Sequence, residues 1–267
     1  MATINASQKQ ILAKKKTLEH LENDALPIMA CIGTREDFEK EPGLTSSLGC
    51  WGENRTKTIY VDYWEYPQAN FLKGIKNAGE KTYAISEIND FDKFSLRYKS
   101  CMGIVVAGKE KMTEKNISFF SHLDSTKILP EGKIRNHFLV DINVLLKEIQ
   151  ERSVYGTIDA VIFGGNYLDS DNVEKNDLMM LMDKVEFEKN YRDFVYLLSD
   201  QIFESLGFRP TIIAGPKTIT GCDDVIYDND HRRLYVRRPK IGETSSESFI
   251  SQDLCEEMEE KWRKEWE

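Results

Sequence analysis

An ordered series of short apolar segments and long amphipathic segments, starting near residue 91, is the feature that most constrains the fold. Met102–Ala107 and Ile117–His122 are apolar runs of strand length, joined by the polar stretch Lys109–Asn116. Apolar residues then recur at spacings of three, four and seven across residues 137–152, which is typical of an amphipathic helix. This part of the sequence therefore predicts a pair of strands followed by a long helix.

The alternation continues toward residue 238. The remaining predicted elements are a buried strand, a second amphipathic helix, a further strand and a hairpin, at Asp159–Phe163, 188–206, Thr211–Ala214 and Asp224–Tyr227 with Arg233–Arg238. This order predicts a layered α/β domain. A doubly wound nucleotide-binding fold is not expected, because no glycine-rich phosphate loop follows a strand.

Composition separates this domain, predicted at 91–240, from the two ends of the chain. A helix is expected at 6–23, and residues 27–90 are rich in aromatic and turn-forming residues, with a strand expected at Thr58–Trp64. We expect residues 1–90 to be an N-terminal extension or a small subdomain. Residues 241–267 hold nine acids and three bases, so they carry −6 of the total charge of −9. They predict a linker and an acidic C-terminal helix.

Several classes of function are disfavoured by composition. The acidic balance argues against nucleic-acid binding, which needs clustered positive charge. No apolar run approaches the ~20 residues that span a bilayer, and the polar N-terminus lacks a secretory signal. Five widely spaced cysteines without a Cys-x-x-Cys pair argue against a disulfide framework or a zinc site. We expect a protein of the bacterial cytoplasm, or one secreted into a host cell as an effector, because its glutamate-rich end resembles type IV translocation signals.

Cysteine chemistry remains open, because the sequence contains neither a His-x-x-x-His motif nor a Gly-x-Ser-x-Gly motif. Cys101 precedes one predicted strand and His122 ends the next. If those strands are antiparallel neighbours, the thiol and the imidazole meet at one end, as a cysteine nucleophile and its base must. The alternative is a buried core cysteine beside a surface histidine. Cys50 is a weaker candidate because no histidine follows it for 72 residues, and the sequence gives Cys222 and Cys255 no partner.

A set of matching segments adds a family resemblance. Ser95 stands six residues before Cys101, with Ser100 between them, and His122 closes the next strand. The later matching segments are Phe163-Gly164-Gly165-Asn166, Lys189-Asn190 at the expected opening of the second helix, and Leu234–Arg238. In order and spacing, residues 95–238 resemble the CheD family of chemoreceptor glutamine deamidases. That family shares a cysteine-hydrolase core with the cytotoxic necrotizing factor toxins and a Burkholderia lethal factor.

The resemblance implies a β-sandwich-like core flanked by helices and a protein-glutamine deamidase that needs no cofactor. It implies Cys101 as nucleophile, His122 as base and Ser95 as the group that orients the imidazole. The residues implied to line the substrate cleft are Ser100, Gly164, Gly165 and Asn166. The protein substrate would be a chemoreceptor or, for a secreted protein, a host protein. The chain departs from the family pattern where Ser95 replaces threonine and Lys99 replaces glycine.

Two other functions stay open at this stage. The same fold could act as a protein-binding module without catalysis, or the thiol could serve a cysteine protease or a transglutaminase. A basic cluster is also consistent with two interpretations, an acidic partner or charges that block pairing at a sheet edge. Its members are Arg232, Arg233, Arg237, Arg238 and Lys240.

Overall fold

The computed structural model describes most of the predicted α/β domain and parts of the region before it. The described residues are 27–33, 37, 58–61, 75–79, 82–98, 101–165, 184–214 and 223–238. The strands within them are β1 Met29–Gly33, β2 Thr58–Tyr60, β3 Ile75–Gly79, β4 Tyr83–Ser86, β5 Asp92–Tyr98, β6 Met102–Lys109, β7 Asn116–Leu123, β8 Asp159–Gly164, β9 Thr211–Ala214, β10 Asp223–Asp228 and β11 Arg233–Arg237. The helices are α4 Ser125–Ile128, α5 Lys133–Arg152 and α6 Lys184–Leu206.

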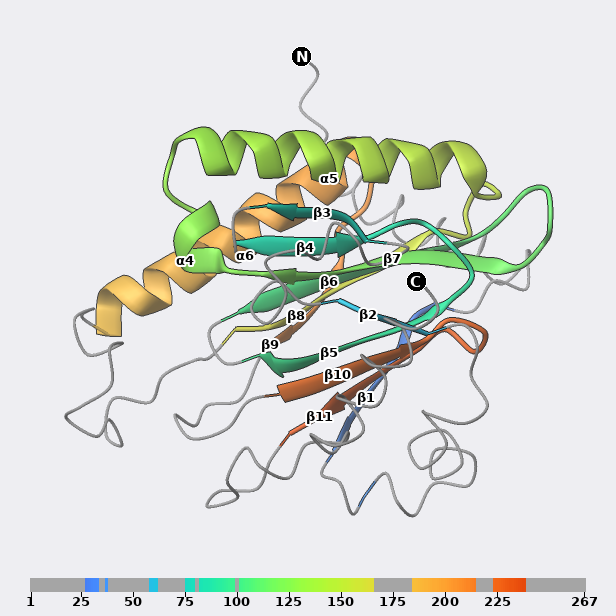
Figure 1. The fold of residues 1–267 in the computed structure, drawn as a ribbon, viewed down its shortest axis with the longest axis horizontal. Helices are drawn as coiled ribbons and strands as arrows, with labels where there is room; N and C mark the ends of the chain where they lie inside the picture. The colour runs from blue at the N-terminus through green and yellow to red at the C-terminus, as the bar shows by residue number, and fades with distance from the viewer. Residues whose placement is uncertain are drawn as a thin grey trace, which may run out of the picture.

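The strands form two mixed sheets, which confirms the mixed α/β class. Sheet A has the order β1-β11-β10-β5-β2, and sheet B has the order β3-β4-β7-β6-β8-β9. In sheet A the two outer pairs, β1 with β11 and β2 with β5, are parallel. In sheet B only the pair of β8 with β9 is parallel. Figure 1 shows α5 and α6 lying along sheet B, with sheet A on the far side of it.

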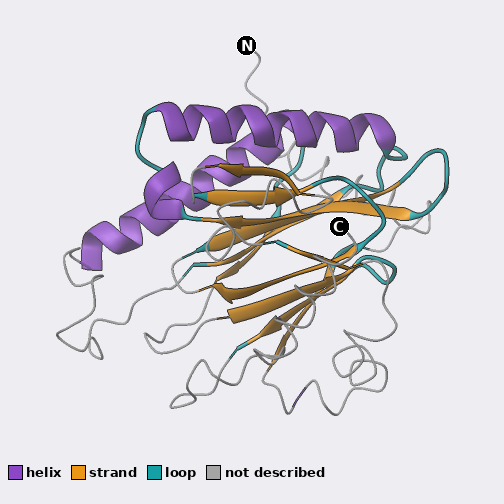
Figure 2. Ribbon diagram, viewed as in Figure 1, coloured by secondary structure: helices purple, strands orange, loops and turns teal. Residues whose placement is uncertain are grey.

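The layers are held by two apolar cores, one on each face of sheet B. Strand β6 supplies both cores, with Ile104 and Val106 toward the helices and Val105 and Ala107 toward sheet A. Because β6 is buried on both faces, its sequence is a continuous apolar run rather than an alternating one. The resulting order of layers is helices, sheet B and sheet A (Figure 2).

The strongest sequence patterns correspond to elements of the structure. Both predicted helices form and begin earlier than expected, at Lys133 and Lys184. One consequence is that Lys189-Asn190 lies inside α6 and does not open it. The helix α5 turns a stripe of apolar residues toward sheet B, namely Phe138, Ile142, Leu145, Leu146 and Ile149. Of the helices in the described residues, none combines the length and apolar composition that a membrane crossing requires.

The described part of residues 1–90 is built into both sheets. Strand β1 pairs with β11 and β2 with β5, while β4 pairs with β7 and carries β3 outside it. These described strands therefore pair with strands of the predicted α/β domain. The predicted strand at Thr58–Trp64 is shorter, at Thr58–Tyr60. The helices expected at 6–23 and near the C-terminus lie outside the described residues.

Candidate active site

Cys101 and His122 lie at the same end of sheet B. Strands β6 and β7 are antiparallel, and their register pairs Met102 with Leu123. His122 is therefore opposite Gly103, and Cys101 lies two residues before Gly103, directly before the start of β6. Residues directly opposite each other, and residues two apart on one strand, point to the same face of a sheet. The thiol and the imidazole are thus diagonal neighbours on the face that packs on sheet A, and the predicted strand pairing is confirmed.

Ser95 reaches the same place from the opposite sheet. In β5 it pairs with Val225, a member of the core between the sheets, so its side chain points at sheet B. The Ser95 Oγ atom lies 2.8 Å from Nδ1 of His122. Ser95 is fully buried and His122 is 1% exposed. Because the two residues belong to different sheets, only the packing of the whole sandwich brings them together.

Cys101 is held through its main chain by the glycine pair at the end of β8. The N–H of Gly165 donates a 2.8 Å hydrogen bond to the Cys101 carbonyl. Both glycines are left-handed, with φ of +80° at Gly164 and +79° at Gly165. A Cβ atom on Gly164 would lie 2.8 Å from the Cys101 carbonyl oxygen, and one on Gly165 would lie 2.6 Å from the Tyr191 ring. The glycines therefore allow a close approach to the residue that carries the thiol.

The thiol itself is largely enclosed. Cys101 is 6% exposed and is not in a disulfide. Of the other sequence candidates, Ser100 and Asn166 lie outside the described residues, as do the weaker thiol candidates Cys50, Cys222 and Cys255. The structure thus brings together Cys101, His122, Ser95 and the glycine pair.

A tyrosine that the sequence did not single out completes the surroundings of the imidazole. The Tyr98 ring stacks on His122 with 4.2 Å between ring centroids and 19° between ring planes. It also meets Phe163 edge-on at 5.2 Å. Tyr98 lies three residues after Ser95, a spacing that does not put two side chains on one face of a regular strand. For this reason the sequence carried no signal for it.

Arginines of β11 and the residue after it pair with carboxylates at the start of β10. Arg238 contacts both carboxylate oxygens of Asp223 through Nε and Nη2, at 3.3 and 3.2 Å. Arg237 contacts Asp224 at 3.2 Å, and both side chains are buried. Burial raises the pKa of Asp223 to about 6, although the hydrogen bond to Arg238 opposes the shift.

These contacts change the interpretation of the basic cluster. Arg232 is also buried, and it donates to the carbonyls of Thr157 and Ala107. Strand β11 pairs with β1 on one side and β10 on the other, so it is not a sheet edge. Arg232 and Arg237 are therefore buried in the fold, Arg238 is paired with Asp223, and the interpretation of β11 as a charged edge is wrong.

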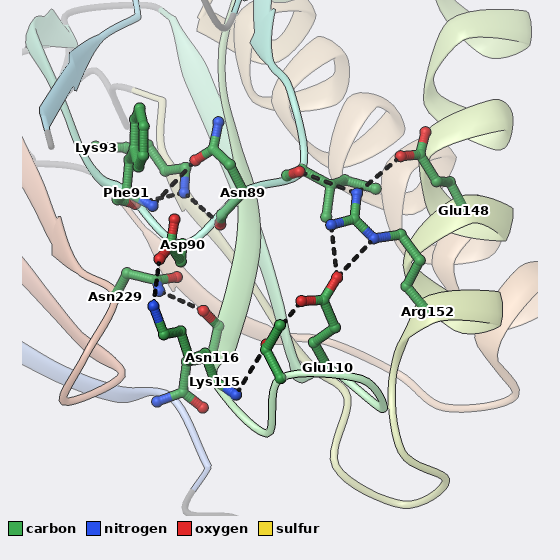
Figure 3. Close-up of polar contacts among 12 residues, drawn as sticks. Asn89, Asp90, Phe91, Lys93, Glu110, Lys115, Asn116, Glu148, Arg152 and Asn229 are labelled. Atoms are coloured by element: carbon green, nitrogen blue, oxygen red, sulfur yellow. Dashed lines mark hydrogen bonds and ion pairs between the residues drawn. The ribbon is translucent and has the colours of Figure 1, made fainter.

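A second polar cluster lies between the sheets at their other end (Figure 3). Lys93 donates to the carbonyls of Asn89 and Phe91 and, at 2.8 Å, to Ser118 Oγ. Ser118 donates in turn to Asn229. Burial lowers the pKa of Lys93 to about 7, although nearby aspartates oppose the shift.

This lysine and serine do not form a second active site. Both Lys93 and Ser118 are fully buried, so a substrate has no route to either. The contact joins β5 to β7, the same two strands that carry Ser95 and His122. We interpret it as a polar link that fixes sheet A on sheet B.

The described part of the chain holds no group of three or more histidine, cysteine, aspartate and glutamate side chains that could hold a metal ion. A scan of the chain against protein-family models gives no match, and a search of curated proteins gives none either.

Proposed function

We propose that this protein is a cysteine-dependent protein-glutamine deamidase, and that its two-sheet sandwich is the CheD-like fold that the sequence resembles. The observation that carries the proposal is the 2.8 Å contact between Ser95 and His122, beside a cysteine on the same face of sheet B. Nucleophile, base and orienting group are the three parts that thiol catalysis requires. Ser95 comes from β5, His122 from β7 and Cys101 from the residue before β6, at the spacing that the family resemblance implies.

The mechanism begins with proton transfer from the Cys101 thiol to Nε2 of His122. Ser95 at Nδ1 holds the imidazole in the tautomer and orientation that this transfer needs. The thiolate attacks the side-chain carbonyl carbon of the glutamine, and backbone N–H groups near Cys101 stabilise the oxyanion. The carbon–nitrogen bond then breaks, the imidazolium protonates the departing ammonia, and a thioester remains. Water hydrolyses the thioester, which leaves a glutamate side chain on the substrate protein and restores the thiol.

The enclosure of the thiol favours a side-chain substrate over a main-chain one. Cys101 is 6% exposed, so a protease would have to bring a peptide main chain against a nearly buried atom. A glutamine side chain is long and narrow, and its amide can reach a recessed thiol. A transglutaminase would form the same thioester but transfer its acyl group to an amine. A deamidase transfers the acyl group to water, so the acceptor distinguishes the two activities.

The substrate class follows from the resemblance alone. A chemoreceptor would be the target in a chemotaxis system, and a host protein such as a GTPase or a translation factor would be the target of a secreted effector. In both cases a neutral amide becomes a carboxylate. One turnover therefore changes the electrostatics of the partner at a single position.

Intact mass spectrometry of candidate substrates tests the proposal. Incubation with the wild type should raise the mass by about one dalton, the difference between an amide and an acid, and Cys101→Ser should abolish the change. Cys31→Ser is the matched control, because Cys31 lies on β1 of the other sheet. Cleavage fragments, or equal activity of Cys101→Ser and the wild type, would show that the assignment is wrong.

The second candidate is a protein-binding module without turnover. The low exposure of Cys101 is also consistent with this function, because a nearly buried thiol is hard for a substrate to reach. A bound partner whose mass stays unchanged, and which binds Cys101→Ser as tightly as the wild type, would support that function. An amine probe such as monodansylcadaverine separates the third possibility, since a transglutaminase attaches it to the substrate.

A further inference from the structure

We infer that Tyr98 is a positioning residue for the active site: its ring fixes the plane of the His122 imidazole and stabilises its protonated form. The inference deepens the proposed function and rests on it for its catalytic meaning. It is carried by the stacked contact, by the irregularity of β5 that makes this contact possible, and by the anchoring of the tyrosine hydroxyl. The contact that carries the inference is with the base, so Tyr98 acts through His122.

A β-bulge turns Tyr98 toward the imidazole. In the pairing of β5 with β10, Ser95 is opposite Val225 and Tyr98 is opposite Asp223, so two residues of β5 face only one of β10. The extra residue restores Ser95 and Tyr98 to one face of sheet A, which a regular strand would not do at a spacing of three. Bulges beside active sites commonly re-aim a side chain in this way.

The ring is fixed on several sides. The Tyr98 hydroxyl donates a 2.9 Å hydrogen bond to the carbonyl of Ser121, the residue directly before His122 in β7. The edge-on contact with Phe163 and the close approach of Gly164 hold the opposite part of the ring. Tyr98 is fully buried. The same strand that carries the imidazole thus anchors the ring that stacks on it.

Two contacts together define the orientation of the base. Ser95 lies at Nδ1, in the plane of the imidazole, whereas Tyr98 lies against its face. The hydrogen bond restrains the imidazole at Nδ1, and the stacked ring also restrains the tilt of its plane. The electron-rich face of the tyrosine ring favours an imidazolium over a neutral imidazole.

Other charged groups near the imidazole have to be considered in any pH measurement. Asp223 lies opposite Tyr98 on β10 and is paired with Arg238. Asp124 follows β7, where it caps α4 and pairs with Lys127. The Cys101 thiol shares the face of sheet B with His122. Burial raises the pKa of Asp223 to about 6 and lowers the pKa of Lys93, two residues before Ser95 on β5, to about 7, so both contributions have to be separated from that of the ring.

Proton NMR of the full-length protein tests the inference without a substrate, because the chain has only four histidines. The His122 ring signals are assigned from their loss in His122→Gln. In Tyr98→Leu the titration midpoint of His122 should fall by roughly 0.5 to 1 pH unit, since a stacked aromatic face stabilises the cation. In Tyr98→Phe, which keeps the ring and loses the hydrogen bond to Ser121, the midpoint should stay closer to that of the wild type than to that of Tyr98→Leu.

Two controls separate positioning from general damage. Phe119→Leu removes an aromatic ring from the same strand as His122, but from its helix-facing side, and should leave the midpoint in place. Repeating the Tyr98 pair in an Asp223→Asn background removes the carboxylate opposite Tyr98, while Lys93 is the same in all the variants compared. An equal midpoint in Tyr98→Leu and the wild type, in both backgrounds, would overturn the inference.

The proposed function and this inference fail in different ways. If no substrate changes mass but the midpoint falls in Tyr98→Leu alone, the deamidase proposal is wrong and the effect of Tyr98 on His122 holds. If deamidation is found and Tyr98→Leu matches the wild type in midpoint and rate, the proposed function holds and the inference is wrong. Where both hold, Tyr98→Leu should lower kcat roughly tenfold or more, with Tyr98→Phe restoring most of it.

Discussion

Ser95 and His122 lie 2.8 Å apart although they belong to different sheets, one on β5 and the other on β7. A buried contact between a hydroxyl and an imidazole is costly to interrupt, because either partner would be left without its hydrogen bond in an apolar interior. The contact therefore couples the packing of the two sheets to the orientation of the candidate base. Any change that moves sheet A relative to sheet B should be felt at His122.

Removal of the Ser95 hydroxyl should slow the chemistry more than it destabilises the fold. We expect Ser95→Ala to lower the deamidation rate roughly tenfold to a hundredfold, because the imidazole loses the group that fixes its tautomer. Ser95→Thr keeps the hydroxyl and matches the residue usual in the CheD family, so it should retain most of the activity. Rates on an identified substrate and urea unfolding of each variant provide the measurement. Full activity in Ser95→Ala would contradict the assigned role.

The close approach of Gly164 to Cys101 predicts a penalty that a matched glycine can isolate. Gly164 and Gly207 share a φ of +80°, but a Cβ on Gly207 would meet nothing within 4 Å. Gly207→Ala should therefore cost only the backbone strain, about 1 kcal/mol. Gly164→Ala adds the collision with the Cys101 carbonyl and should cost about 1 to 3 kcal/mol more. Urea midpoints of the two variants test this, and equal costs would mean that the contact with Cys101 carries no strain.

The sequence predicted the elements with the strongest apolar patterns. Helices α5 and α6 show a helical period on the face that packs on sheet B, and strands β6 and β7 are short apolar runs because they supply both cores. The pairing of β6 with β7 could also be foreseen from the short polar turn between them, and with it the shared position of Cys101 and His122.

The remaining strands and the contacts around His122 depend on pairing and packing between segments that are distant in the chain. Strand β5 was not predicted, because Asp92–Tyr98 contains a buried lysine and a bulge that break its alternation. Strands β1 and β4 are short and gain their order from pairing with β11 and β7. The contact of Ser95 with His122 arose only from the family resemblance, and the place of Tyr98 arose from neither pattern nor resemblance.

Lys93 should make the stability of the protein rise with pH above neutrality. Its pKa is about 7 in the folded protein against 10.5 for an ordinary lysine, so between these values the unfolded chain holds a proton that the folded one lacks. The free energy of unfolding therefore increases with pH across this window, and below the window Lys93 adds nothing to its pH dependence. Protonated below pH 7, the lysine imposes its full desolvation cost.

Lys93→Met provides the comparison. The difference in unfolding free energy, wild type minus variant, should grow by on the order of 2 kcal/mol between about pH 7.5 and 9.5. Parallel urea titrations at both pH values measure it, and the subtraction cancels the other groups that titrate in this range. A difference that is constant with pH would show that the amine is ordinary in the folded state.

Of the two described thiols, Cys101 should react at the lower pH even though Cys31 is the more exposed. Cys31 on β1 is the more exposed, and Cys101 is 6% exposed. If His122 accepts the Cys101 proton, the pH at which iodoacetamide alkylates Cys101 at half its maximal rate should lie below ~8.5, the pKa of an ordinary thiol. Cys31, on β1 of the other sheet, provides the comparison. Peptide mass spectrometry after timed labelling gives both rates from one sample.

Two variants complete this test. His122→Gln should move the Cys101 profile toward that of an ordinary thiol while leaving Cys31 unchanged, since it removes the base and keeps a polar side chain of similar length. Cys31→Ser should leave the Cys101 profile in place. If His122→Gln has no effect on Cys101, the two residues do not act as a pair. Their position on one face of sheet B would then reflect packing alone.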